Sequence, residues 1–335
     1  MRVRAYEVAP DGATANEDYD YEDRSQRELT MKKIPVILDT DLGTDIDDSW
    51  AIAYMLKCPE LDVKLITTAT GDTTYRAKLC ARLLRAGGRT DVPIGIGIPL
   101  GAVKESLYDY ANELDLAHYA GKVLQDGVQA MIETIMGSKK KVILISIAPT
   151  PNIARALYLE PRIAQKARFV GMQGSVRKGY NGLAGRVDEE YNVVAYAYDA
   201  ARVFQAAWDM TITPVDTCGV VRLTGEKFKK VLGSKDPLTQ ELMKSYQRWS
   251  KGGAWEKHAK QMSSVLFDTV AIYLAFSDEW LKLERLGIRT KWGFTIEDPN
   301  AKKMSVATEW KSDGLDAFEE HLVKRLCSRY AGGYT

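Results

Sequence analysis

The sequence predicts an α/β protein with an open, mostly parallel (mixed) Rossmann-like sheet flanked by helices, and with a helical C-terminal region. Between residues 34 and 215, short apolar segments typical of strands alternate with stretches whose apolar residues recur at helical spacing. Residues 141–147, KVILISI, form an almost continuous apolar run, which is typical of a central parallel strand buried on both faces. Acidic and amide residues gather where these strands are expected to end, the usual ligand position in such a sheet.

The expected elements follow in order along the chain. Strands are predicted at residues 34–38, 63–69, 92–98, 141–147, 169–172 and 211–215. Helices are predicted at about 51–56, 77–84, 123–136, from 153 onward and at 199–207, and loops at 101–121 and 175–190. Residues 238–276 are expected to be largely helical, 288–310 to form a hairpin with a turn at 298–300, and 314–330 to form a last helix.

Composition and charge limit the classes of function. The net charge of +1 gives no electrostatic basis for a nucleic-acid or membrane partner, and no apolar run reaches the length of about 18 residues that a membrane span needs. The four cysteines are far apart and form no CxxC pair, so we expect free thiols in a reducing compartment and a cytoplasmic location. Residues 1–30 hold eight acids and four arginines, which predicts a flexible extension ahead of a single α/β domain over 31–335.

Five aspartates follow the first predicted strand within ten residues: Asp39, Asp41, Asp45, Asp47 and Asp48. Like charges packed this closely repel one another, and burying each of them costs free energy. A bound cation removes both penalties. Because no cysteine or histidine lies among these oxygen donors, the cluster favours a hard ion, Ca²⁺ or Mg²⁺.

Further acidic and amide residues stand at later predicted strand ends or helix starts: Asp72, Asn152, Glu190 with Asn192, and Asp268. The carboxyl ends of parallel strands face one crevice, so we expect these side chains to converge on the aspartate cluster and to contact the substrate. The set is rich in carboxylates and amides and poor in basic residues. It therefore favours a metal and a polyhydroxylated substrate such as a sugar over a phosphate.

Four segments in order resemble one family. ILDTDLGTDIDDSWA is similar to the N-terminal signature of the nucleoside hydrolases, that is, the inosine-uridine-preferring nucleoside N-ribohydrolases. ILISIAPTPNIARAL, FVGMQG with EEYNVV, and SVLFDTVAIYLA resemble that family's later segments. The resemblance covers nearly all of the chain from residue 31. It implies a Ca²⁺-dependent glycosidase that cleaves the N-glycosidic bond of ribonucleosides or related ribosides, by direct attack of a metal-bound water, to give ribose and free base.

The resemblance also implies roles for individual residues. Asp41 would be both a metal ligand and the general base, and the other ligands would be Asp48, Asp268 and the backbone carbonyl of Ile147. Asp47 and Asn192 would hold the ribose diol, Glu190 would bind the 5′-hydroxyl, and Asp39 would be a structural partner in the turn. The family implies a homodimer or a homotetramer.

The chain departs from the family pattern at its signature and around the base. Asp45 is an extra acid, so the choice between Asp45 and Asp47 for the ribose stays open. Phe267 stands where the family has a histidine that protonates the leaving base, and Asp72 stands where an asparagine is common. No clear match exists for the family's histidine near residues 105–120, where His118 lies in different surroundings.

The base side of the site is therefore open to several interpretations. Phe267 and Trp255 are candidates for stacking on the aglycone, with core packing an equal alternative for Trp255. His258 is a candidate acid, although its lysine neighbours favour a surface position. Residues expected at the surface are Arg76, Arg177, Arg186 and His321, with Arg177 and Arg186 able to meet a charged aglycone if their loop covers the site.

Three other interpretations fit the sequence less well. IPVILDTDLGT superficially fits a haloacid-dehalogenase-type phosphatase with Asp39 as nucleophile, but no downstream lysine and acidic pair complete that set. An EF-hand loop counted from Asp39 has Thr44 instead of glycine and Trp50 instead of glutamate. The third is a weakened family member that binds a nucleoside or sugar through Ca²⁺ but hydrolyses it poorly, which the absent histidine motivates.

Overall fold

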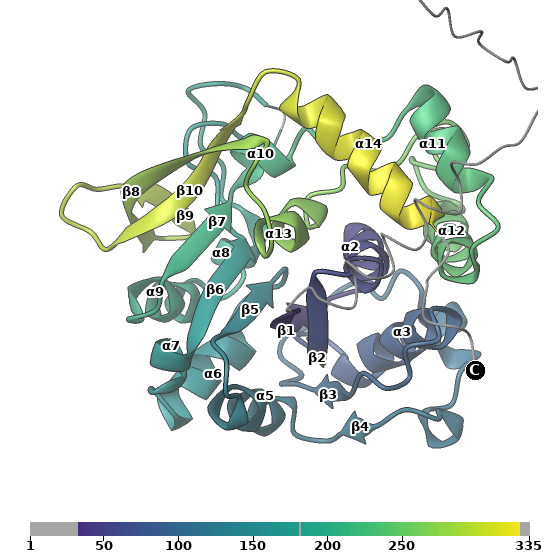
Figure 1. Cartoon of the computed structure of the whole chain (residues 1–335), viewed down its shortest axis with the longest axis horizontal. Coiled ribbons are helices and arrows are strands. Elements are labelled where there is room, and N and C mark those ends of the chain that lie inside the picture. The colour runs from purple at the N-terminus through teal and green to yellow at the C-terminus, as the bar shows by residue number, and fades with distance from the viewer. Residues whose placement is uncertain (1–32, 181, 329–335) are drawn as a thin grey trace, which may run out of the picture. The chain divides into compact units, whose positions relative to one another are not determined.

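The computed structural model describes residues 33–180 and 182–328, and these form an open sheet with helices on both faces (Figure 1). Within them the strands lie in the order β4 (Val123–Leu124), β3 (Ile94–Ile96), β2 (Leu61–Thr68), β1 (Ile34–Thr40), β5 (Val142–Ser146), β6 (Ala167–Met172), β7 (Met210–Thr213), β10 (Lys303–Trp310), β8 (Leu281–Lys291) and β9 (Phe294–Glu297). The expected extension over residues 1–30 lies outside the described residues.

The sheet is parallel from β4 to β10, and only β8 and β9 run antiparallel to their neighbours. The predicted open, mostly parallel, mixed sheet is therefore confirmed. In β1 the side chains of Val36 and Leu38 pack into one core and that of Ile37 into another, all fully buried. Successive strand residues face opposite sides of a sheet, so the two cores lie on its two faces. This explains why the strand reads as a continuous apolar run.

Helices cover both cores. The Val36 side carries α2 (Asp47–Leu56), α3 (Thr73–Ala86), α10 (Val215–Cys218), α11 (Gly225–Leu232), α12 (Pro237–Ser250), α13 (Thr269–Leu274) and α14 (Gly314–Cys327). The Ile37 side carries α5 (Gly127–Gly137), α6 (Pro151–Leu159), α7 (Ile163–Lys166), α8 (Tyr191–Val194) and α9 (Ala197–Gln205). The connection between β3 and β4 contains α4 (Tyr108–Asn112) and a 3₁₀ turn, η1 (Leu116–His118). No helix among the described residues is long and apolar enough to span a bilayer.

Several predicted boundaries are wrong for local reasons. The helix expected over 123–136 starts only at Gly127, because Asp126 accepts a hydrogen bond from the Gln129 N–H (2.9 Å) and caps it. The segment 238–276 is helical only at its two ends, and residues 251–267 between α12 and α13 are irregular. The hairpin expected over 288–310 is a longer arrangement in which β8 pairs with β9 on one side and β10 on the other.

The chain reverses its direction of sheet growth at β1. From β1 it proceeds outward through β2, β3 and β4, and then crosses back to β5 on the other side of β1. Loops leaving β1 and β5 therefore diverge at their carboxyl ends, which opens the crevice where doubly wound sheets bind ligands. The Ile147 N–H donates to the Asp39 carbonyl (2.9 Å) and joins the two strand ends at this point.

Candidate functional site

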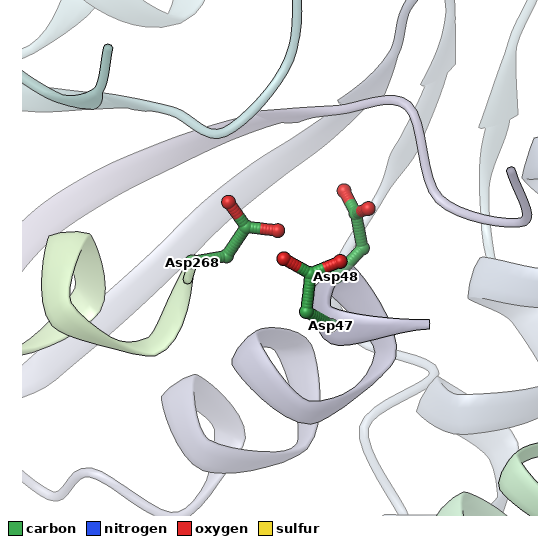
Figure 2. Close-up of side chains that lie close together, drawn as sticks. All are labelled: Asp47, Asp48 and Asp268. Carbon is green, nitrogen blue, oxygen red and sulfur yellow. The ribbon is translucent and has the colours of Figure 1, made fainter. Parts of the chain in front are cut away.

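Three buried carboxylates converge at this switch point. Asp47 and Asp48 begin α2, and Asp268 immediately precedes α13. A carboxylate oxygen of each residue lies within 4.8 Å of those of the other two. Figure 2 shows the Asp268 carboxylate approaching those of Asp47 and Asp48 from a separate helix. Residues more than two hundred positions apart thus form one cluster, as expected for a site at the carboxyl edge of the sheet.

Burial raises the pKa of all three carboxyl groups well above the usual range, and the negative charges of the neighbouring aspartates raise it further. Asp47 and Asp268 also share a side-chain hydrogen bond, and the Thr40 hydroxyl donates to Asp48. Three carboxylates cannot all be ionised here without a counter-charge. Their oxygens are the donors that a hard cation such as Ca²⁺ prefers, so the cluster fits such an ion.

Asp41 lies beside this cluster but is not part of the three-residue group. It directly follows β1, is 6% exposed, and interacts electrostatically with Asp48 and Asp268. Burial raises the pKa of Asp41 to about 6, against the opposing effect of the Arg76 guanidinium. An acid with this pKa is suited to accept a proton near neutral pH.

Arg76 is fully buried, and the expectation that it lies at the surface is wrong. Its Nε donates to the Thr70 carbonyl (2.8 Å), Nη1 to the Leu42 carbonyl (2.8 Å) and Nη2 to the Thr44 hydroxyl (3.0 Å). The guanidinium thereby ties α3 to the segment between Asp41 and α2. Its charge also lowers the pKa of Asp41 and Asp48, in opposition to burial. Helical spacing alone gave no signal that this arginine points inward.

The loop between Asp41 and α2 depends on Gly43. Its φ is +105°, a left-handed conformation that favours glycine, and a Cβ there would lie 2.7 Å from the Tyr75 hydroxyl. That hydroxyl donates to the Gly43 carbonyl (2.8 Å). Asp45 lies on the exposed part of this loop and accepts from the neighbouring Ile46 N–H (2.7 Å), whereas Asp47 points into the cluster. Of these two aspartates, only Asp47 joins the cluster with Asp48 and Asp268.

Glu190 and Asn192 form the opposite wall, at the carboxyl end of β6. Glu190 is 1% exposed, and its two oxygens accept from the Asn192 N–H (2.8 Å) and the Gly174 N–H (2.8 Å). Burial raises the pKa of Glu190 to about 7. The Asn192 amide donates to the Met172 carbonyl (3.1 Å). Electrostatic coupling between Glu190 and Asp41 indicates that this wall and the aspartate loop are close.

Asp39 and Asn152 hold the strand ends together. One oxygen of Asp39 accepts from the Thr67 hydroxyl and from the Asn152 amide (2.9 Å). The same amide donates to the Thr68 carbonyl (3.0 Å), and its oxygen accepts from the Ile98 N–H (2.9 Å). Both side chains are fully buried, although the second oxygen of Asp39 has no hydrogen-bond partner in the described part of the chain. The three hydrogen bonds of the Asn152 side chain indicate a structural role, and its predicted substrate contact stays a prediction. The complete burial of Asp39 argues against a phosphatase nucleophile.

Asp72 caps α3, accepting from the Thr74 N–H (2.8 Å) and the Tyr75 N–H (2.9 Å). Its side chain is exposed, so the helix cap accounts for it without a substrate, and its predicted contact with substrate stays a prediction. Within the described part of the chain Asp39 also sits inside β1, which rules out the EF-hand loop counted from that residue.

The aromatic wall of the site contains Phe267 and Tyr180. Their rings meet edge to face, with centroids 5.8 Å apart at an angle of 83°. Phe267 is half-buried and immediately precedes Asp268. Tyr180 belongs to the glycine-rich loop over 175–190, and its hydroxyl accepts a hydrogen bond from the Tyr191 N–H (2.9 Å). Tyr180 was not predicted from the sequence, where only the position of its loop pointed to the site.

Other candidates on the base side have structural partners. The Trp255 indole donates to the Tyr246 hydroxyl (2.7 Å), which supports core packing over the predicted aglycone contact. His258 is exposed and lies against Trp255, and His118 is exposed and pairs with Asp115 (3.3 Å). The prediction that His321 is solvated is wrong.

His321 lies among the rings of Tyr54, Tyr273, Phe276 and Trp280. Burial in this aromatic cluster lowers the pKa of His321 to about 4. It is therefore neutral near pH 7 and is part of the packing between α2, α13 and α14.

The loop over 175–190 is anchored to the sheet hairpin. Arg177 pairs with Glu284 of β8 (2.9 Å) and with Glu297 of β9 (2.6 Å), so it is not available to meet an aglycone. The Ser175 N–H donates to the Thr295 hydroxyl, which donates back to the Ser175 carbonyl (both 2.8 Å). Arg186 pairs with Asp188 (2.8 Å) within the loop itself.

Comparison with known proteins decides the family. The profile of the inosine-uridine preferring nucleoside hydrolases matches residues 36–317. The chain belongs to this family. Its members are glycosidases that act on N-glycosyl compounds, and the resemblance found in the four sequence segments is thereby confirmed.

Named relatives agree with this family. A probable uridine nucleosidase 2 of Arabidopsis thaliana is 26% identical over 299 residues, which cover 82% of this chain and 89% of that protein. A pyrimidine-specific ribonucleoside hydrolase, RihA, of Escherichia coli is 28% identical over 240 residues, which cover 66% of this chain and 74% of that one. The plant nucleoside hydrolase PpNRh1 has the same fold, with a TM-score of 0.73 and 19% identity over 88% of this chain and 99% of its own.

Proposed function

We propose that this nucleoside hydrolase family member is a Ca²⁺-dependent hydrolase of the N-glycosidic bond of ribonucleosides or related ribosides, releasing ribose and free base. The observation that carries the proposal is the convergence of Asp47, Asp48 and Asp268 within 4.8 Å at the switch point of the sheet. A buried cluster of this kind, in a chain of this family, is suited to a hard cation and a sugar diol.

Asp48, Asp268, Asp41 and the Ile147 carbonyl would hold the ion. When bound, Ca²⁺ supplies charge that stabilises the ionised carboxylates and lowers the pKa of a water molecule beside it. Asp41 accepts the proton of the attacking water at its carboxylate, in keeping with its pKa of about 6. Asp47 and Asn192 bind the ribose hydroxyls, and Glu190 binds the 5′-hydroxyl.

The surrounding carboxylates also favour the reaction electrostatically. Cleavage of an N-glycosidic bond passes through a sugar with oxocarbenium character, which carries positive charge. Buried carboxylates at fixed positions stabilise that charge more strongly than water does, because the local dielectric constant is low. None of these residues has to form a covalent bond to the sugar.

The proposal extends to assembly and location. Homodimers or homotetramers are what the family resemblance implies. A cytoplasmic location is supported by the four cysteines, which are all free in the structure. The oligomeric state is measurable by light scattering on the purified protein.

A second candidate function is binding without efficient turnover. Phe267 carries no proton donor at the position where the family has a histidine, and this observation favours it. A chromatographic screen of natural ribosides with purified protein distinguishes the two. We expect equal amounts of ribose and free base from at least one ribonucleoside. A protein that binds Ca²⁺ and nucleosides but releases no base from any riboside would contradict the hydrolase and support the binding protein.

A further inference from the structure

Tyr180 lies where the sugar-binding wall and the aromatic wall meet, and the reaction proposed above assigns it no role. Its ring packs edge to face on Phe267. Its hydroxyl accepts from the N–H of Tyr191, the residue between Glu190 and Asn192. Asp47 and Glu190 are near enough to raise the pKa of Tyr180 electrostatically. Tyr180 thus contacts the segments that carry Phe267 and Tyr191, and it is within electrostatic range of Asp47.

The proton of this hydroxyl is free to bind a ligand. A phenol both donates and accepts, and the Tyr191 N–H occupies one acceptor position. Across residues 33–180 and 182–328, the Tyr180 hydroxyl donates to no protein acceptor in the structure. Burial keeps the phenol neutral, since it raises the pKa of Tyr180 above the ordinary value. Tyr180 is therefore a hydrogen-bond donor and not a source of transferred protons.

The backbone holds Tyr180 in a defined position. Its N–H donates to Asp188 (2.9 Å), and a Cβ on the preceding Gly179 would lie 2.2 Å from the same carboxylate. Asp216 accepts hydrogen bonds from the N–H groups of residues 176–178 at 2.7–3.1 Å. A donor that is fixed before the substrate arrives stabilises developing charge at little cost in reorganisation.

We propose that Tyr180 is a specificity-determining residue whose hydroxyl donates a hydrogen bond to the departing aglycone. This inference rests on the proposed function. As the C1′–N bond breaks, its electron pair moves onto the aglycone. The oxygen of water bonds to C1′, and the proton of that water passes to Asp41. Negative charge spreads over the ring of the base, where the Tyr180 hydroxyl stabilises it, and solvent later supplies the proton. Phe267 beside it has no group that donates.

The proposal identifies the class of substrate that depends on Tyr180. It is a riboside whose leaving group is a poor one and carries an acceptor next to the glycosidic nitrogen, as O2 of a pyrimidine or N3 of a purine does. A p-nitrophenyl riboside does not need this help, because p-nitrophenolate is already a stable anion. The dependence on the leaving group therefore separates aglycone stabilisation from sugar binding.

The test compares Tyr180→Phe with the unaltered enzyme on uridine, inosine and p-nitrophenyl riboside. We expect kcat/KM for the most active nucleoside to fall about 10- to 100-fold, with the loss mainly in kcat, and the value for p-nitrophenyl riboside to change by less than about threefold. Tyr198→Phe is the matched control, because Tyr198 is 91% exposed and loses the same hydroxyl. It should leave all three rates unchanged.

Two outcomes would overturn the inference alone. An equal loss on nucleosides and on p-nitrophenyl riboside would mean that the hydroxyl only supports the Tyr191 backbone and the sugar-binding wall. No loss on any substrate would mean that the hydroxyl does not contact the aglycone. If the unaltered enzyme cleaves none of the three ribosides, the proposed hydrolase itself fails, and the role of Tyr180 fails with it.

Discussion

The acidic half of the site (Asp41, Asp47, Asp48 and Asp268) and its aromatic half (Tyr180 and Phe267) are built differently. The acidic residues lie at a strand end and at helix starts and are buried. Arg76 is hydrogen-bonded to the loop that carries three of them. The aromatic residues lie on segments without regular structure and are half-buried. The sheet thus positions the half proposed to bind sugar and metal, whereas loops position the half proposed to meet the aglycone.

This difference indicates which residues of the site tolerate substitution. A carboxylate in the acidic half cannot change without removing a proposed ligand of the ion or the sugar, so substitutions there should cost the most activity. A ring in the aromatic half can change with a smaller loss of activity, because neither ring is one of the clustered carboxylates. Substitutions in the two halves test this ranking, from the largest expected effect to the smallest.

Asp268→Ala should give the largest loss. It removes one of three clustered carboxylates, so we expect Ca²⁺ binding to be lost in titration calorimetry and kcat/KM to fall about 10³-fold or more, equivalent to about 4 kcal/mol. Glu226→Gln, an exposed carboxylate on α11, is the control and should behave like the parent protein. Near-normal rates for Asp268→Ala would refute the metal site.

Asp41→Ala should follow. Loss of a general base costs about 10²- to 10⁴-fold in kcat, and loss of a ligand should also weaken Ca²⁺ binding. Asp41→Asn keeps an oxygen donor while removing the base, so it should retain more Ca²⁺ affinity than Asp41→Ala at a similarly low kcat. Equal activity of Asp41→Asn and the parent protein would show that another group takes the proton.

Arg76→Met should lower stability and disturb the acidic half together. Two buried carbonyls and a partly buried hydroxyl lose their donors, so we expect the free energy of unfolding in urea to fall by about 2–4 kcal/mol. Arg162→Met, at an exposed ion pair, is the control and should leave the free energy of unfolding unchanged. An Arg76→Met protein as stable as the Arg162→Met control would mean that the guanidinium does not brace the aspartate loop.

The fall of stability with rising pH should be smaller when Ca²⁺ is present. Burial raises the pKa of Asp39 and Glu190 to about 7 and that of Asp41 to about 6, so the folded metal-free protein holds these protons more tightly than the unfolded chain. The stability they contribute is present below about pH 4 and is lost as the pH rises through 6 and 7. Melting temperatures in chelator should therefore fall between pH 5 and 8.

Saturating Ca²⁺ supplies the control for that measurement. Ca²⁺ held by the ionised Asp41, Asp48 and Asp268 would stabilise the folded protein, so the same rise in pH should lower the melting temperature less. A metal-free protein whose stability increases steadily from pH 5 to 8 would contradict the raised pKa values of this cluster.

Phe267→His should have the smallest effect of the series. It places a donor beside Asp268, so turnover of a purine nucleoside should rise by up to about tenfold if the missing acid limits the rate. Turnover of p-nitrophenyl riboside should not change. A fall in both rates would show that Phe267 is needed for packing against Tyr180 and not merely as a substitute for histidine.

The fold and the acidic half were largely predictable from the sequence. The fold follows from the spacing of apolar residues, and the acidic half from the place of its aspartates at expected strand ends and helix starts. The run from Ile34 to Thr40 is buried on both faces, and Asp47 begins the helix that follows it. Asp268 stands at the start of a later helix and meets Asp47 at the carboxyl edge of the sheet. The arrangement of the strands in the sheet determines where these residues meet, whatever their distance along the chain.

Other features depended on tertiary contacts that no local pattern reveals. Arg76 sits at helical spacing like any surface arginine, and only the position of the aspartate loop turns it inward. Asn152 was expected to meet the substrate because it follows a strand, whereas it bonds to three neighbouring strand ends. Tyr180 lies in an irregular loop whose course is set by Asp216, Thr295 and Glu284, residues from other segments.

The most direct test of the account is the hydrolysis of p-nitrophenyl riboside followed through removal and return of Ca²⁺. Chelator should abolish the release of p-nitrophenol, and added Ca²⁺ should restore it in the parent protein. In Asp268→Ala, added Ca²⁺ should restore no release. Hydrolysis that continues undiminished in chelator, or that Ca²⁺ restores equally in Asp268→Ala, would contradict the claim that Asp41, Asp48 and Asp268 hold a catalytic metal ion.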